Sequence, residues 1–246
     1  ARRILPPVYF MIIVLIPIVF YVYPPHAVKD FSQSIVAVIA FLSNYFFYFE
    51  LDYFNDISDV SPLIHTWSLS IEEQFYFIFP AFLILTTKVK KSLKIAFLLF
   101  LTIAGYLYSI YLANIDPSFA YFHFFSRFWQ ILFGSFIAML LIKNESLFKS
   151  NKLNGFISIL GAVIIILALT LINNEDPYPN YLAILPVFGT GLLIISLNKN
   201  NKYGFIYRLF TYKPIVFTGL LSYSLYLWHQ PVFAIYREFT LLQINL

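Results

Sequence analysis

The chain has 246 residues, of which 60% are hydrophobic and only 11% are charged, whereas a soluble domain carries roughly a quarter charged residues. This composition excludes an ordinary water-soluble fold, and the lack of cysteine excludes disulfides, thiolate metal sites and cysteine nucleophiles. The net charge of +4 indicates basic loops beside a membrane rather than nucleic-acid binding.

Seven apolar stretches are long enough to cross a bilayer as helices, because about 20 residues span about 30 Å of hydrocarbon. They cover residues 4–23, 68–87, 93–113, 121–142, 153–172, 181–197 and 215–231. No alternation typical of barrel strands occurs, so the predicted fold class is all-α, a polytopic transmembrane helix bundle. Because no long polar linker interrupts the chain, residues 1–246 are predicted to form a single integral-membrane domain.

An eighth apolar stretch, residues 31–49, is shorter and contains serines, a glutamine and an asparagine. Most basic residues lie before residue 4 and in 88–94, 143–152 and 199–213. Basic loops stay in the cytoplasm, and all four regions do so only if 31–49 leaves the membrane on the side it entered. We therefore predict a re-entrant or interfacial segment. The alternative is an ordinary short helix with one atypical basic loop.

Residues 65–76, HTWSLSIEEQFY, place a histidine, two carboxylates, a glutamine and three hydroxyl side chains at the expected outer end of a helix. Ionisable groups inside a bilayer cost about 2.5–3.5 kcal/mol each on insertion scales, which makes them functional candidates. Ser68 or Ser70 as a helix cap, with Glu72 in the first turn, is the structural alternative. A polar substrate or a proton path would explain why the whole group gathers there.

Arg127 lies about two turns into an otherwise apolar helix. It is expected to face the bundle interior and to pair with Glu72 or Glu73; the alternative is an arginine that snorkels beside Trp129. His229 ends the last predicted helix, where it can move a proton near neutral pH, as acyl transfer to a hydroxyl requires. The alternative is a belt residue at the membrane interface.

The sequence contains no zinc-type histidine pair, phosphate-binding glycine loop or nucleophile elbow, so no metal and no tightly bound cofactor is predicted. These residues alone indicate a polar site in a membrane bundle. They do not distinguish a transferase from a transporter.

Several motifs resemble those of the acyltransferase 3 family of bacterial integral-membrane acyltransferases, which includes O-antigen acetylases. The similarity runs in the family's order from residue 3 to residue 231. It is carried by RILP at 3–6, HTWSLSIEEQFY at 65–76, RFWQILFG at 127–134, PVFGT at 186–190 and SYSLYLWHQP at 222–231.

The resemblance implies transfer of an acyl group, usually acetyl from cytoplasmic acetyl-CoA or another acyl-CoA, to a carbohydrate hydroxyl at the outer side of the bacterial cytoplasmic (inner) membrane. The expected partners are the bilayer, acyl-CoA and the carbohydrate acceptor, with no nucleic acid. The catalytic residues implied are Glu72, Arg127, His229 and His65. The substrate-binding residues implied are Trp67, Ser68, Ser70, Glu73, Gln74 and Trp228. Arg2 and Arg3 would face the donor, whose phosphates need fixed cations.

The family usually begins with two further helices, which carry an arginine and a histidine thought to be the catalytic base. It also ends with a further helix, and none of the three has a counterpart in the predicted elements. We therefore expect an incomplete chain or a truncated product. A non-catalytic membrane carrier of acyl or glycan intermediates, or an inactive remnant, is the alternative function. A carrier is typically built from two repeated halves with broken helices, and no such repeat occurs.

Overall fold

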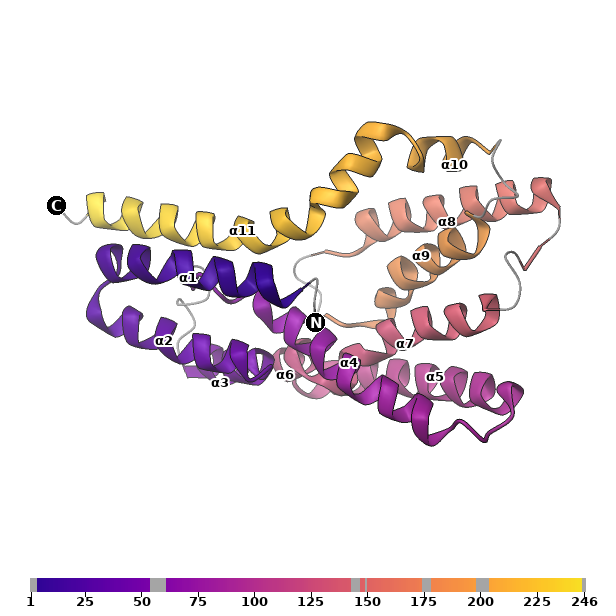
Figure 1. Ribbon diagram of the computed structural model, residues 1–246, viewed down its shortest axis with the longest axis horizontal. Coiled ribbons are helices and arrows are strands. Elements are labelled where there is room, and N and C mark those ends of the chain that lie inside the picture. Colours follow the sequence, from indigo (N-terminus) through magenta and orange to yellow (C-terminus); the bar gives the residue numbers. More distant parts are fainter. Residues whose placement is uncertain are drawn as a thin grey trace. The chain divides into compact units, whose positions relative to one another are not determined.

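The computed structural model describes residues 4–53, 61–142, 147–148, 150–173, 178–197 and 204–244, and all regular structure within them is helical, as predicted (Figure 1). Five helical stretches are long and apolar enough to cross a membrane: Leu5–Val22, Thr66–Leu85, Lys91–Ile115, Pro117–Leu141 and Asn151–Leu171. Each matches a predicted span closely, because long apolar runs leave few alternatives to a helix in lipid.

The other two predicted spans differ from the structure. Residues 181–197 form a short 3₁₀ turn, η2 (Tyr181–Ala183), and α9 (Ile184–Ser196), and α11 (Lys213–Ile244) is much longer than the predicted 215–231. The predicted count of seven full spans is therefore not confirmed. The prediction that His229 ends its helix is wrong, because α11 continues through Pro231 into a further helical run.

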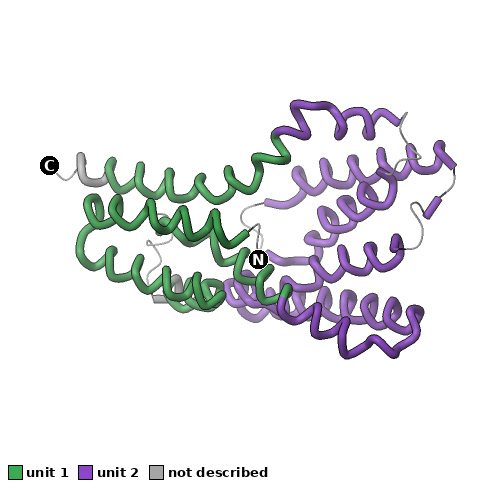
Figure 2. Tube along the Cα trace, in the orientation of Figure 1, with its two compact units in different colours: residues 1–76, 218–246 green, residues 77–217 purple. Residues whose placement is uncertain are grey.

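The helices pack as two compact units within the predicted single domain (Figure 2). Unit 1 comprises residues 1–76 and 218–246, and unit 2 comprises residues 77–217. Two helices have residues in both units, α4 (Thr66–Leu85) and α11.

Unit 1 contains α1 (Leu5–Val22) followed by a helical hairpin, α2 (Pro25–Ile39) and α3 (Ser43–Tyr53). Phe41 turns the hairpin with a φ of 59°, the left-handed conformation that ends many helices. Two backbone bonds close this turn, Leu42 N to Ala37 O at 2.8 Å and Phe41 N to Val38 O at 3.1 Å.

The hairpin agrees with the predicted re-entrant segment at 31–49. With 15 and 11 residues, α2 and α3 are about 22 and 16 Å long, so neither reaches across about 30 Å of hydrocarbon. Beside the hairpin, α1 runs parallel to the later part of α11. The Tyr223 hydroxyl donates to Ile4 O at 2.8 Å, and the rings of Phe10 and Trp228 meet edge to face.

Unit 2 is built from helix pairs. Its helices are α5 (Lys91–Ile115), α6 (Pro117–Phe122), α7 (Phe124–Leu141), α8 (Asn151–Leu171), α9 and α10 (Phe205–Phe210). α5 packs along α7 and α8 packs along α9, whereas α7 and α9 touch over a shorter stretch. Glycines permit the close approach of α8 and α9: a Cβ on Gly161 would lie 2.8 Å from Gly189 O.

Candidate functional site

Two segments of unit 1 bring several predicted polar residues together, the start of α4 and the middle of α11. A turn over residues 62–65 leads into α4, and Tyr226 and His229 share a face of α11 because they are three residues apart. We call the four residues that meet here the histidine–tyrosine cluster: His65, Ser68, Tyr226 and His229.

The Tyr226 hydroxyl joins α11 to the start of α4. It donates to the backbone carbonyl of His65 and lies 2.7 Å from Ser68 Oγ. A phenol has a single proton, so Ser68 is the donor in the second bond. The imidazole of His65 lies 5.4 Å from the Tyr226 ring and 5.4 Å from the His229 ring, measured between centroids. Tyr226 therefore holds both histidines in place.

His229 has one ring nitrogen bonded to its own helix. Nδ1 lies 2.6 Å from the carbonyl oxygen of Tyr226. A carbonyl can only accept, so Nδ1 carries the proton in this contact, and in the neutral ring the lone pair is on Nε2. The side chain is exposed. His229 can therefore take a proton from a bound ligand through Nε2.

His65 has the opposite environment. It is 6% exposed, and neither ring nitrogen makes a hydrogen bond of good geometry among the described residues, although the backbone of Leu227 and of Pro62 lies close to the ring. Burial and, to a smaller extent, the nearby His229 lower the pKa of His65 to about 3. The His65 ring is therefore neutral at physiological pH and can offer a donor and an acceptor to a polar ligand.

The two predicted carboxylates lie further along α4. Glu73 is 3% exposed, and its Oε1 has no hydrogen-bond partner among the described residues, whereas Glu72 is partly buried. Both charges act electrostatically on Tyr223 of α11. A buried carboxylate oxygen without a hydrogen-bond donor is unfavourable, so Glu73 is suited to accept a hydrogen bond from a hydroxyl group of a ligand.

Ser70 and Gln74, predicted to bind substrate, hold the α2–α3 hairpin against α4. Ser70 Oγ lies 2.7 Å from Ser43 Oγ. Gln74 Nε2 donates to Phe41 O at 2.7 Å and to Asn44 Oδ1 at 2.9 Å. Both side chains have a clear structural role as a result, and their contact with substrate stays a prediction.

The remaining predicted residues of this region are two tryptophans and two arginines. Trp67 is half-buried in the first turn of α4, and Trp228 packs against Phe10 with ring centroids 6.4 Å apart. The predicted donor-side residues, Arg2 and Arg3, lie outside the described residues.

Arg127 belongs to unit 2, in α7, and is 7% exposed. Its Nε donates to Tyr121 O at 2.9 Å, and its guanidinium carbon lies 4.6 Å from the ring centroids of both Tyr121 and Tyr178. Two aromatic faces thus stabilise the cation locally. Its pairing with Glu72 or Glu73, which belong to unit 1, stays a prediction.

Sequence reasoning missed Tyr223 and Tyr226. Both lie in the 222–231 motif, but among 19 tyrosines a phenol gives no signal by itself. The spacing of 223, 226 and 229 puts two hydroxyls on the helix face of His229. This shared helix face could have identified both tyrosines from the sequence. It was not used, because the helix was predicted to end at residue 231.

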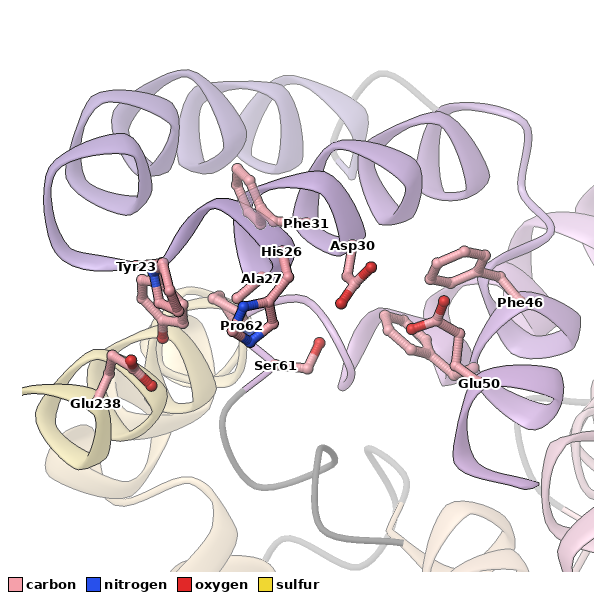
Figure 3. Close-up of a pocket in the computed structure, with 12 residues that line it drawn as sticks. Tyr23, His26, Ala27, Asp30, Phe31, Phe46, Glu50, Ser61, Pro62 and Glu238 are labelled. Carbon is pink, nitrogen blue, oxygen red and sulfur yellow. The ribbon is translucent and has the colours of Figure 1, made fainter. Parts of the chain in front are cut away.

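A separate pocket of about 130 Å³ lies in unit 1, where α1 ends and α2 begins (Figure 3). Three carboxylates far apart in sequence line it, Asp30, Glu50 and Glu238. The polar and aromatic residues of the same lining are Tyr23, His26, Ser61, Phe31, Phe46 and Phe47. Figure 3 shows Tyr23 beside Glu238 and Asp30 between His26 and Glu50.

Burial sets the protonation of this pocket. It raises the pKa of the Glu50 carboxyl, and the charge of Asp30 raises it further, while Lys29 acts in the opposite sense. Burial and then Glu238 also raise the pKa of Tyr23, so its phenol stays a hydrogen-bond donor. No group of three or more histidines and carboxylates in the described part of the chain is close enough to hold a metal ion.

Comparison with known proteins gives a family match over the whole chain. The family model described as an acyltransferase domain, Acyl_transf_3, matches residues 1–246. The peptidoglycan O-acetyltransferase OatA of Listeria monocytogenes is 31% identical over 95% of this chain and 39% of its own length. The O-acetyltransferase OatA of Staphylococcus aureus is 26% identical over 97% of this chain and 40% of its own length.

The chain thus spans about two fifths of the length of these curated relatives. No solved structure matches it.

Proposed function

Because the chain belongs to the acyltransferase 3 family, we propose that it transfers an acyl group, most simply acetyl, to a hydroxyl of a cell-envelope carbohydrate. The proposed donor is cytoplasmic acyl-CoA, and the proposed location is the bacterial cytoplasmic membrane. The names of its relatives support the acceptor class, since the one from Listeria is a peptidoglycan O-acetyltransferase.

The observation that supports this function best is the fixed imidazole of His229. With Nδ1 held by Tyr226 O, Nε2 takes the proton of the acceptor hydroxyl while that oxygen attacks the acyl carbonyl carbon. The tetrahedral intermediate expels the thiolate of CoA, and the imidazolium returns the proton to the sulfur. An ester and a free thiol form, and His229 ends as it began.

The other proposed catalytic residues act on charge and orientation. His65 stays neutral and contacts the reacting hydroxyl. Glu72 balances the imidazolium of His229, and Arg127 stabilises the developing oxyanion. Buried groups of this kind act strongly because the surrounding dielectric is low.

The α2–α3 hairpin supports a proposal for the side of the membrane on which the site lies. If it is re-entrant, α1 ends and α4 begins on one side, away from the basic loops. The pocket in Figure 3 then faces outward, where carboxylates accept hydrogen bonds from sugar hydroxyls and aromatic rings cover the apolar faces of a sugar. The proposed donor-side residues stay Arg2 and Arg3, on the basis of sequence alone.

The decisive experiment measures esters on envelope sugars. The protein is expressed in a strain whose own envelope O-acetyltransferases are deleted, and released sugars are analysed by mass spectrometry. We expect an O-acetyl ester with the wild type and none with Glu72→Gln or Arg127→Gln at equal membrane abundance.

Two outcomes would overturn parts of the proposal. Esters unchanged in both variants would remove Glu72 and Arg127 from the site. No ester with the wild type, together with altered export of glycan, would favour the carrier function.

A further inference from the structure

A second hollow lies in unit 2, on the seam between α7 and α9. It is a groove of about 320 Å³. Four of its residues come from α7, namely Gln130, Phe133, Gly134 and Ile137, while Tyr178 precedes α9 and the others lie on α9. The seam is open because α7 and α9 touch over only a short stretch.

Glycines define where the two helices touch and where they do not. A Cβ on Gly191 of α9 would collide with the Phe133 ring and lie 2.8 Å from Ile137 Cδ1, so the helices meet there. On α7, a Cβ on Gly134 would meet no atom within 4 Å. Gly134 therefore borders the open groove, although α7 and α9 are in contact nearby at Gly191.

The groove has a polar end and an apolar end. Gln130 and Tyr178 line one end, and Ile137 and Ile194 line the other. Gln130 and Ile137 are seven residues apart, so the groove follows α7 for about 10 Å. This is the shape of a site for an amphiphile whose apolar chain lies along the helices.

The polar end presents a donor and lies near a cation. Gln130 Nε2 is buried and has no hydrogen-bond partner among the described residues. Arg127 lies 4.6 Å from the ring centroid of Tyr178, the residue that forms the groove wall. A buried amide donor beside a guanidinium favours an acceptor-rich, negatively charged head group.

We propose that the groove binds one chain of an anionic phospholipid, whose ester or phosphate oxygens accept a hydrogen bond from Gln130. The occupant is a lipid rather than a soluble anion, because most of the lining is apolar and α7 belongs to a helical stretch long enough to span a bilayer. The site shares Arg127 with the proposed acyl transfer but is tested by lipid binding alone, so either proposal can fail without the other. It uses the face of α7 formed by positions 127, 130 and 134, the arginine, glutamine and glycine of the RFWQILFG motif.

The test is photocrosslinking to the purified protein in mild detergent. Two probes are compared, phosphatidylglycerol and phosphatidylcholine, each with the same photoreactive acyl chain, and labelled peptides are located by mass spectrometry. We expect phosphatidylglycerol to label residues 124–141 or 184–196 in preference to phosphatidylcholine.

Variants separate the chain from the head group. Gly134→Phe fills the groove without a backbone clash and is expected to lower labelling about tenfold, the equivalent of about 1.4 kcal/mol. Gly155→Phe is the matched control, since Gly155 also has nothing within 4 Å of a Cβ but does not line the groove. Gln130→Leu is expected to retain the label and abolish the preference for phosphatidylglycerol. Melting curves establish that each variant is folded.

Several results would contradict the proposal. Equal labelling by both lipids in the wild type would remove the head-group site, and unchanged labelling of a folded Gly134→Phe protein would remove the chain site. If Gly134→Phe does not fold, the Gln130→Leu comparison decides. Displacement of the label by a long-chain acyl-CoA but not by excess phosphatidylglycerol would assign the groove to an acyl donor and overturn the lipid assignment.

Discussion

The two units of the molecule hold their helices together in different ways (Figure 2). In unit 1, side-chain hydrogen bonds join helices far apart in sequence, as between Ser43 and Ser70 or between Ser68 and Tyr226. In unit 2, most side-chain hydrogen bonds are local to a helix, and glycines such as Gly161 and Gly189 let the backbones approach closely.

The difference separates chemistry from scaffolding. In lipid, helices associate through packing of small residues and through hydrogen bonds between polar side chains, because the hydrophobic effect does not favour one apolar contact over another. Unit 2 relies mainly on packing. Unit 1 uses polar contacts, and the same residue types that join its helices surround His65 and His229. Changes in unit 1 should therefore affect catalysis first, and changes in unit 2, apart from those at Arg127, should affect stability first.

The largest expected effect tests the chemical side of this contrast. His229→Gln removes the proposed base, so acyl transfer to a carbohydrate acceptor should fall by about 10²–10⁴-fold. The melting temperature should change little, because the side chain is exposed. The assay is ester formation by protein reconstituted in vesicles. Retained activity, or a large loss of thermal stability, would contradict the assignment of catalysis to unit 1.

A glycine replacement in unit 2 should do the reverse. Gly161→Ala places a Cβ 2.8 Å from Gly189 O, and forcing the helices apart should destabilise the protein by about 1–3 kcal/mol. Gly155→Ala, on the same helix but with open space around it, should instead stabilise by up to about 1 kcal/mol. Thermal unfolding in detergent measures both. A Gly161→Ala protein as stable as the wild type would show that the α8–α9 contact is not close.

A third change tests whether polar contacts in unit 1 also carry stability. Gln74→Leu removes the hydrogen bonds that Gln74 Nε2 donates to Phe41 O and Asn44 Oδ1, at a cost of about 1–3 kcal/mol. The hairpin backbone should then exchange amide protons faster over residues 37–45, measured by hydrogen–deuterium exchange. Unchanged exchange there would mean that the turn at Phe41 is held by its backbone bonds alone.

The smallest effect concerns pH. The pKa of Glu50 is raised above its ordinary 4.5 by burial and by Asp30, so the folded protein binds this proton more tightly than the unfolded chain. The stability that Glu50 contributes is therefore present below pH 4.5 and is lost as pH rises through the folded pKa. Glu50→Gln should raise the melting temperature slightly at pH 7 and not at pH 4. A lower melting temperature at pH 7 would show that ionised Glu50 has a stabilising partner.

Hydropathy and charge predicted the helical class, five long spans and the turn within 31–49, because these depend on local chain properties and on the bilayer. They did not predict that α11 continues past Pro231, since a proline usually marks a helix boundary in sequence. The local partners of Arg127 were also missed. Tyr178 lies 51 positions away, and only the folded path of α8 and α9 brings it to the guanidinium.

The site shows the same division. The grouping of residues 65–76 was readable because polar residues are rare in this chain, whereas the phenols of Tyr223 and Tyr226 were hidden among many aromatics. Ser70 and Gln74 carried the same polar signal as Ser68. Their bonds to the hairpin distinguish them only once the tertiary structure is known.

Pro231 has a consequence for the backbone around the histidine–tyrosine cluster. A proline has no N–H, so the carbonyl of Leu227, four residues earlier in α11, lacks the donor that a continuous helix would supply. That oxygen lies one turn before Pro231, between Tyr226 and His229 along the helix. The His65 ring lies against the backbone of Leu227, so this carbonyl can accept a hydrogen bond from the imidazole in place of the missing helix donor. Shortening a nearby side chain would not remove this acceptor. Replacing Pro231 with a residue that has a backbone N–H would restore the helical hydrogen bond to Leu227 O.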